Sequence, residues 1–296
     1  MKRTFSLTGL ATTFAAFGMA SPAAAKDGEQ PAAPQADDLE SAIAGTVFDG
    51  DWIAVGMGVA YGPTYDGSDD YAPYAVPGVI GQIGGIGISP RPAGLALNLI
   101  PRAKEGPSFS FGPAVRLRTS RSGKVDDPVV DRLDRLDRAL EVGPTVGMTF
   151  PKILSPYDQL SFGTDVRWDV LGAHGGMTVS PAVTYFTPLS RGAAAALSVS
   201  TEYGDGDFME YYYSVTPAQT ARSGLKQFDA GAGFTEIGVT LAGGLDLSGD
   251  LTDGGFSIVV AGGYSRMLGD AASSPFTSER GSKDQWLAAI GLGYVF

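Results

Sequence analysis

Residues 140–150 read LEVGPTVGMTF, and this stretch decides the fold. Its even positions are all apolar, from Leu140 to Phe150, whereas its odd positions hold one glutamate, two glycines and two threonines. Side chains along an extended strand point alternately to opposite faces. The stretch therefore predicts a β-strand with one apolar face and one face of small or polar residues.

The same alternation recurs along most of the chain. It marks the segments 52–62, 108–119, 158–170, 176–187, 193–204, 232–246, 255–267 and 285–296. In a soluble sandwich or lipocalin-like barrel, which is the alternative, the polar face would contact bulk water. Here that face is mostly Gly, Ala, Ser and Thr, which suits a lumen, while aromatic and branched side chains in segments of about 10 residues suit lipid. The pattern favours an all-β fold, a transmembrane antiparallel β-barrel of the outer membrane of a Gram-negative bacterium.

Loop lengths predict the number of strands. Bacterial barrels have short periplasmic turns and long external loops. With 73–83 as the second strand and 85–100 divided at Ser89-Pro90-Arg91-Pro92, the long segments 63–72, 120–138, 205–231 and 268–284 all become external. An undivided 85–100 would place 120–138 in the periplasm. We predict 12 strands, with 10 as the alternative.

Aromatic residues gather at the predicted strand ends. Those at external ends are Tyr61, Trp168, Tyr203, Tyr264 and Trp286, and those at periplasmic ends are Phe109, Phe150, Tyr185, Phe256, Tyr294 and Phe296. Two such belts are typical of a barrel in a bilayer, so we expect contact with outer-membrane lipid and lipopolysaccharide. The alternation that closes on Tyr294 and Phe296 resembles the insertion signal that the barrel-assembly machinery reads.

The N-terminus predicts export. Lys2 and Arg3 precede a short apolar run, and Ala23-Ala24-Ala25 forms a small-residue cleavage site around Ala23 and Ala25. These features predict a signal peptide over 1–25. Residues 26–50 are acidic and poor in aromatic residues, which predicts a disordered periplasmic lead-in, and 51–296 would form the barrel.

Composition excludes several function classes. The chain has no cysteine and one histidine, so thiolate chemistry is excluded and little remains for imidazole catalysis. A net charge of −11 argues against nucleic-acid binding. We expect no cofactor and no enzymatic activity.

Charges on the predicted lumen face form one band near the external mouth. Its members are Arg116, Arg118, Glu141, Asp165, Arg167, Asp169, Glu202 and Glu236. Such charges must pair or stay hydrated, and neighbouring strands should bring Arg116 or Arg118 to Glu141 and Glu141 to Arg167. The band predicts either an ion-pair network that closes the mouth or a charged constriction that selects solutes. The lower lumen is expected to hold only Gly, Ala, Ser and Thr.

Three weaker signals remain. His174 lies in a glycine-rich loop between Asp169 and Ser180, where we expect it to support a turn rather than act as a base. Asp66, Asp69 and Asp70 are weak candidates for a cation site, although their spacing departs from the EF-hand pattern. The repeated Asp-Arg-Leu of 131–138 is expected to be a solvated surface.

The chain also resembles the MipA/OmpV family of outer-membrane proteins. The matching stretches are GMGVAYGPTYDGSDD at 56–70, DVLGAHGG at 169–176, YSVTPAQ at 213–219, Ser223-Gly224, DAGAG at 229–233, YSRMLGDAA at 264–272, Ser274-Pro275 and GLGYVF at 291–296. Tyr213-Ser214 stands where the family usually reads Phe-Gly. The resemblance implies an outer-membrane barrel and, for the best-known member, a scaffold that links a lytic murein transglycosylase to a bifunctional murein synthase. Other members are treated as porin-like or adhesive proteins.

Overall fold

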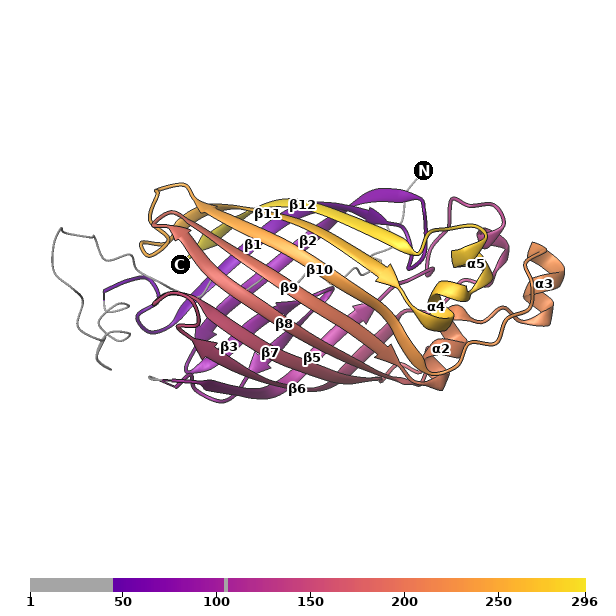
Figure 1. Ribbon diagram of the computed structural model, residues 1–296, viewed down its shortest axis with the longest axis horizontal. Coiled ribbons are helices and arrows are strands. Elements are labelled where there is room, and N and C mark those ends of the chain that lie inside the picture. Colours follow the sequence, from indigo (N-terminus) through magenta and orange to yellow (C-terminus); the bar gives the residue numbers. More distant parts are fainter. Residues whose placement is uncertain (1–44, 104–105) are drawn as a thin grey trace.

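The computed structural model describes residues 45–103 and 106–296, and these form a closed antiparallel barrel of 12 strands (Figure 1). The strands are β1 Trp52–Pro63, β2 Tyr71–Ile83, β3 Ile86–Arg91, β4 Gly94–Asn98, β5 Ser108–Arg118, β6 Ala139–Pro151, β7 Gln159–Asp169, β8 Met177–Ser190, β9 Ala193–Gly204, β10 Gly233–Asp246, β11 Gly255–Met267 and β12 Asp284–Val295. The prediction of 12 strands is confirmed, and 85–100 is divided into β3 and β4; the turn lies at 92–93, however, because Ser89, Pro90 and Arg91 still belong to β3. The predicted signal peptide with Ala23 and Ala25, and most of the lead-in, lie outside the described residues.

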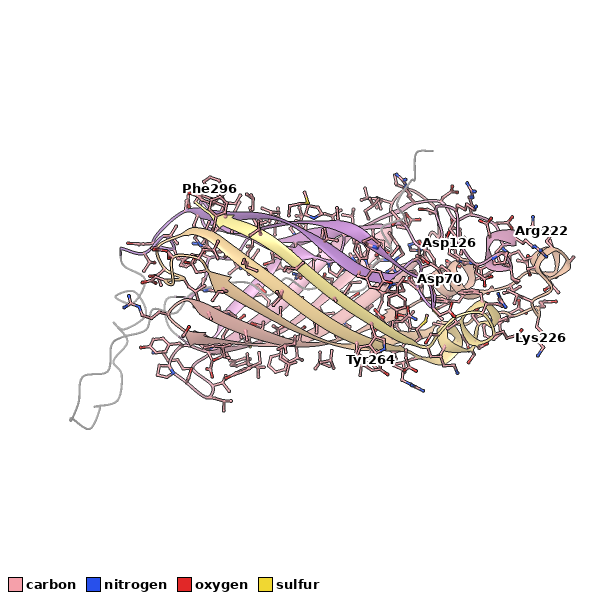
Figure 2. The ribbon with its side chains drawn as sticks, turned by 90° about the horizontal axis from the view of Figure 1, so that it is seen from above. Asp70, Asp126, Arg222, Lys226, Tyr264 and Phe296 are labelled. Atoms are coloured by element: carbon pink, nitrogen blue, oxygen red, sulfur yellow. The ribbon has the colours of Figure 1, made fainter. Side chains whose placement is uncertain are left out.

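Each strand pairs with its neighbours in sequence, and β1 pairs with β12 to close the barrel. At one end of the barrel the strand connections are short, and β12 ends there. We call this end of the barrel the turn end. The opposite end, called the loop end, carries the long connections and all the helices of the described chain (Figure 1). Figure 2 shows Phe296 at the turn end and Asp126, Arg222 and Lys226 at the loop end.

The outer wall of the barrel is apolar. Met57, Phe111 and Leu292, from three different strands, are all about half exposed and point away from the lumen. Aromatic rings meet near both ends of the wall, as in the pair Tyr264–Trp286 toward the loop end and the pair Phe256–Tyr294 at the turn end. Since backbone groups in lipid must pair within the protein, a closed barrel with this wall is suited to a bilayer. In the described part of the chain, no helix has the length and apolar character to cross a membrane.

Near the turn end, the residue types that line the lumen differ from those predicted. In the middle of the barrel the lumen face carries small side chains on some strands, as the cross-strand pair Ala242–Ala261 illustrates, and a cluster of Ala60 and Leu287 with Tyr74 and Val76 on others. Near the turn end, however, Phe186 is buried inside the barrel against Leu251, and Phe48 packs edge-on against Trp52. The expectation of only Gly, Ala, Ser and Thr in the lower lumen is therefore wrong there. Alternation does place Phe186 in the lumen, because its neighbour Tyr185 faces outward, whereas Phe48 and Leu251 come from the segment before β1 and from the β10–β11 turn, which strand alternation cannot predict.

The connections at the loop end fold together into a cap. It contains the 3-10 helix η1 Val130–Arg132 and the helices α2 Gly206–Tyr213, α3 Pro217–Ser223, α4 Gly269–Ser273 and α5 Pro275–Ser278. The side chain of Asp205 accepts from the backbone N–H of Phe208 at the start of α2, and Thr216 and Gln219 form a capping box on α3. These caps allow very short helices to persist once their apolar faces are buried.

Candidate functional site

The charged residues of the lumen come from neighbouring strands near the loop end. In the cross-strand register, Arg116 of β5 lies opposite Glu141 of β6, and Glu141 lies opposite Asp169 of β7. All three therefore point into the lumen. The structure thus places the band where the alternation puts it, although the register alone does not decide which side chains pair.

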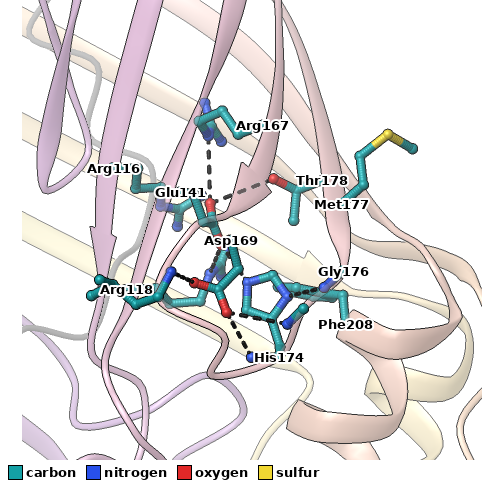
Figure 3. Close-up of polar contacts among 12 residues, drawn as sticks. Arg116, Arg118, Glu141, Arg167, Asp169, His174, Gly176, Met177, Thr178 and Phe208 are labelled. Atoms are coloured by element: carbon teal, nitrogen blue, oxygen red, sulfur yellow. Dashed lines mark hydrogen bonds and ion pairs between the residues drawn. The ribbon is translucent and has the colours of Figure 1, made fainter.

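Glu141 is at the centre of these contacts (Figure 3). Its Oε1 accepts from Arg118 Nε at 2.7 Å, and its Oε2 lies 3.4 Å from Arg167 Nε. Arg167 also donates to Asp165 at 2.7 Å. Arg116, the register neighbour of Glu141, instead extends to Glu202.

Glu202 carries the network across the lumen. It lies on β9, and it accepts from Arg116 and Arg118 of β5, four strands away along the wall. The Arg118 Nη2 to Glu202 distance is 2.9 Å. In a hydrated constriction, charged side chains would lie along the strands that carry them and leave the centre of the lumen open. Here the side chains of β5 and β9 contact each other across the lumen. We call this set of charged residues the charge network. Its members are Arg91, Arg116, Arg118, Arg167, Asp66, Glu141, Asp165 and Glu202.

The charge network is dry and balanced. The side chain of Glu141 is fully buried, and those of Arg118 and Arg167 are less than 5% exposed. Four arginines face four carboxylates, and every charge of the network therefore has a partner of opposite sign. Such burial is tolerated only when opposite charges pair, and within the network the Nε of Arg116 is the buried atom left without a hydrogen-bond partner among the described residues.

Two members of the charge network were not predicted from the sequence. Arg91, at the tip of the β3–β4 hairpin, donates to Asp165 at 2.9 Å. It lies two residues after Ser89 on the same strand face, so the alternation signal was present, but the prolines around it predicted only a turn. Asp66, which the sequence suggested for a cation site, points to Arg118 at 3.8 Å.

Asp169 and Glu236 lie outside the charge network. Asp169 accepts from the backbone N–H groups of Leu171, His174 and Gly175, and it thereby holds the β7–β8 loop. Glu236 lies opposite Glu202 and borders a small cavity of about 10 Å³, roughly the space of one water molecule. Both residues lie at the loop end of the lumen, as predicted for the band. Asp169 binds the backbone of a loop, however, whereas Glu236 borders a cavity.

His174 is a buried structural residue in this geometry. Its Nδ1 accepts from the backbone N–H of Gly176 at 3.1 Å, which places the ring proton on Nε2, 3.4 Å from Glu141. The ring packs edge-on against Phe208. Ser180, which follows His174 by six residues, bonds to Arg167 rather than to the imidazole, so these residues do not form a nucleophile–base pair.

The candidate cation site is not assembled. Among the described residues, no three His, Cys, Asp or Glu side chains converge as metal ligands would. Asp66 faces Arg118, whereas the backbone N–H of Asp70 binds Ser68 in the same loop.

The cap covers the charge network with an apolar core. Its buried residues are Tyr65, Val125, Val130, Leu133, Leu136, Phe208, Met209, Tyr212, Tyr213, Val215, Leu225, Ala230, Met267, Ala271, Ala272 and Phe276. The Arg118 guanidinium lies 4.7 Å from the ring centre of Phe208, and Arg121 lies 4.4 Å from that of Phe276. Burial raises the pKa of Tyr65 to about 12, as expected for a phenol in a dry core.

The cap corrects the interpretation of residues 131–138. The expected solvated surface is wrong for Leu133 and Leu136, which are buried in the cap core. Only the charged positions remain at the surface, where Asp134 pairs with Arg222. The period-three repeat is a signal for this division, because it spaces the leucines evenly; both follow η1, and Leu133 already has an extended backbone.

The predicted insertion signal occupies the last turn-end positions of β12. The backbone N–H of Phe296 donates to Ile53 on β1, and its ring contacts that of Tyr294 on the outer wall. The side chain is well exposed to the surroundings of the barrel. A recognition role for Tyr294 and Phe296 stays a prediction.

A closed barrel with an apolar wall, aromatic rings at both ends and buried charges in its lumen defines a bacterial outer-membrane β-barrel protein. The family described as MltA-interacting protein MipA matches residues 55–296, and the chain belongs to this family. Its location is accordingly the outer membrane.

Solved barrels show a distant likeness. OmpT of Vibrio cholerae has 6% identity and a TM-score of 0.36, with 83% of this chain and 97% of that chain covered. The translocator domain of the autotransporter NalP from Neisseria meningitidis has 10% identity and a TM-score of 0.32, covering 87% and 92%. The channel DcaP of Acinetobacter baumannii has 10% identity and a TM-score of 0.31, covering 83% and 96%. No curated protein matches the chain.

Proposed function

We propose that the protein is a non-catalytic scaffold that presents its turn end to murein-remodelling enzymes in the periplasm. The observation that carries the proposal is the closure of the loop end by both the charge network and the cap, which favours a role for the exposed turns at the opposite end over a role as a channel. The family description, MltA-interacting protein, supports a lytic transglycosylase as one partner. A murein synthase would be the second, as the family resemblance implies.

The turn end offers two elements to such a partner. The first is the acidic lead-in, which is attached to the rim where Val47 N–H donates to Thr252 O at 2.9 Å. The second is the β6–β7 turn, which exposes 81% of Leu154. The turns alone provide little of the roughly 800 Å² per partner that a stable interface needs. A partner must therefore contact the lead-in together with the turns.

Deletion of residues 27–45 with the signal peptide retained tests this proposal. We expect weaker capture of a purified lytic transglycosylase by the immobilised barrel, with barrel assembly intact on a heat-modifiability gel. A matched variant, in which the acidic residues of 27–45 become Asn or Gln, separates charge from length. Undiminished capture after the deletion would contradict the proposal.

A further inference from the structure

The barrel wall has an incomplete seam between β2 and β3. β2 pairs with β1 along its whole length, from Trp52–Gln82 to Pro63–Tyr71. On its other side it pairs with β3 only at Gly81, Gln82 and Ile83. Residues 71–80 of β2 therefore form a strand edge inside the wall, because no described residue of β3 continues the ladder past Gly81.

Proline placement shows that this edge is encoded in the sequence. If the β2–β3 register continued, Val79 would lie opposite Pro90, which has no N–H to donate. β2 itself carries Pro73 and Pro77, which likewise remove donors from the strand. Within sheets, proline is confined to edges and bulges. The seam is therefore a feature of this chain's wall and of the lipid-facing surface beside it.

A cavity inside the barrel reaches this seam. Its volume is about 90 Å³, several times the roughly 10–15 Å³ that one water molecule needs. Gly78, Val79, Ile80 and Pro90 line it on the seam side. The lining farther in is largely apolar and includes Phe48, Trp52, Phe186, Leu251 and Val259.

The cavity holds no free charge. Asp246 is its single ionisable lining residue, and that carboxylate already accepts from Ser248 and Gly249 in the β10–β11 turn. Glycines 56, 78, 291 and 293 leave parts of the wall as bare backbone, which makes room for a narrow ligand. A cavity with such a lining favours an apolar guest over water.

We propose that this cavity binds one hydrocarbon chain of a membrane phospholipid, which enters from the bilayer between β2 and β3. The headgroup stays at the membrane surface, because the cavity contains no partner for its charge. The proposal does not rest on the scaffold role: Phe48 of the lead-in and Leu251 of the β10–β11 turn line the cavity, but the experiments below measure lipid in the lumen and not the capture of a partner.

Trp52 provides the reporter. The chain has three tryptophans, and Trp168 and Trp286 lie exposed on the outer wall, so both are replaced by Phe to leave Trp52 alone. This full-length protein is reconstituted into vesicles of phosphatidylcholine with brominated acyl chains. Bromine quenches at short range, so a chain in the cavity should quench Trp52 strongly relative to vesicles without bromine.

Gly78→Phe tests the cavity itself. A Cβ at Gly78 meets no atom within 4 Å, so the ring projects into the cavity without a backbone clash. We expect this variant to lose most of the quenching. The matched control is Ala75→Phe, which adds the same ring to the exposed outer face of the same strand and should quench like its parent.

Native mass spectrometry of the detergent-extracted protein provides a second measurement that needs neither bromine nor a tryptophan reporter. We expect one retained phospholipid per barrel, lost in the Gly78→Phe protein and kept in the Ala75→Phe protein. Absence of Trp52 quenching in the parent, or equal quenching in both Phe variants, would overturn the proposal. Quenching by a free brominated fatty acid but not by the phospholipid would also overturn it, because the chain would then not come from the bilayer through the seam.

Discussion

Glu141 is the residue on which the charge network depends most, because Arg118 and Arg167 share its fully buried carboxylate. Glu141→Gln keeps the shape of the side chain but leaves buried positive charge unmatched. We expect the free energy of unfolding to fall by about 3–5 kcal/mol, measured by urea titration of the refolded protein in detergent.

The control for Glu141 is an exposed ion pair. Asp134 pairs with Arg222 at 2.8 Å, and both side chains are more than half exposed. Asp134→Asn should therefore cost less than about 1 kcal/mol. Similar losses in the two variants would mean that burial adds nothing to the charge network.

Asp158 predicts a pH dependence at the turn end. Partial burial disfavours its charge, but hydrogen bonds from the Tyr185 hydroxyl and from the N–H groups of Leu154, Ile153 and Ser155 outweigh this and hold the pKa of Asp158 below its usual value. Since the folded-state pKa is the lower one, the stabilisation is complete above the unfolded value of about 3.9 and is lost as the pH falls through the folded value.

Asp158→Asn should therefore lower the urea midpoint at neutral pH, and its difference from the wild type should shrink as the pH falls below about 3.9. The exposed Asp126, replaced in the same way, provides the control. A difference that stays constant down to acidic pH would show that the loss comes from packing and not from the carboxylate.

At this scale the sequence predicts which face a charge occupies but not its partner. The alternation places Arg116, Glu141 and Glu202 in the lumen, because strand geometry has a fixed period of two residues. It cannot show that Arg116 bypasses its register neighbour for Glu202, since that choice depends on the width of the closed barrel. Long arginine side chains reach across the lumen, and neighbour rules do not describe them.

At the scale of elements, the strands follow from the sequence and the cap does not. Every strand repeats a local pattern, whereas α2 has 8 residues and α4 has 5, too few to give a clear helical period. The cap is stabilised by contacts between loops that are distant in sequence, such as Tyr65 with Phe276 and Arg121 with Tyr212. Tertiary burial, not propensity, forms these helices.

Phe208 tests whether the cap is an independent apolar core. It is fully buried, and its ring contacts those of Tyr212 and His174. We expect Phe208→Ala to loosen the cap by about 3–5 kcal/mol while the barrel remains assembled. Trypsin added to intact cells should then cleave the cap at its exposed arginines, such as Arg132 and Arg222, far faster than in the wild type.

The comparison residue for Phe208 is Phe234, which lies half exposed on the outer wall. Phe234→Ala should leave trypsin sensitivity unchanged, because that ring packs beside Tyr203 and outside the cap core. Equal resistance of the Phe208 and Phe234 variants would show that the cap does not need its apolar core.

At the scale of the whole molecule, strand count, strand direction and the side with long loops all follow from the sequence, because alternation and loop length are local properties. Closure of the loop end does not follow from it. The sequence favours a sealed mouth but leaves a charged constriction open as the alternative, and these correspond to a scaffold and to a porin-like channel. The dry contacts of the charge network favour the sealed mouth.

Conductance in planar bilayers tests this closure. We expect the wild-type protein to show no open-channel steps, and Arg116→Ala/Arg118→Ala to leak, because Glu202 then has no crosswise partner on β5. Arg135→Ala/Arg138→Ala, which removes two exposed loop arginines, is the matched control and should stay closed. A wild type that conducts, and that becomes more cation-selective without Arg116 and Arg118, would favour the porin-like channel.

The crosswise contacts of Glu202 also bear on the order of assembly. The residues that it joins are 84 and 86 positions apart in the chain, and the contact needs β5 and β9 on facing walls. A partly inserted sheet therefore leaves these arginines without their carboxylate, and contacts so distant in sequence form late. We therefore expect a barrel that lacks a hairpin to leave Arg116 without Glu202, whereas Arg118 keeps Glu141 on the neighbouring strand. Pulsed protease digestion during refolding should find the loop end protected last.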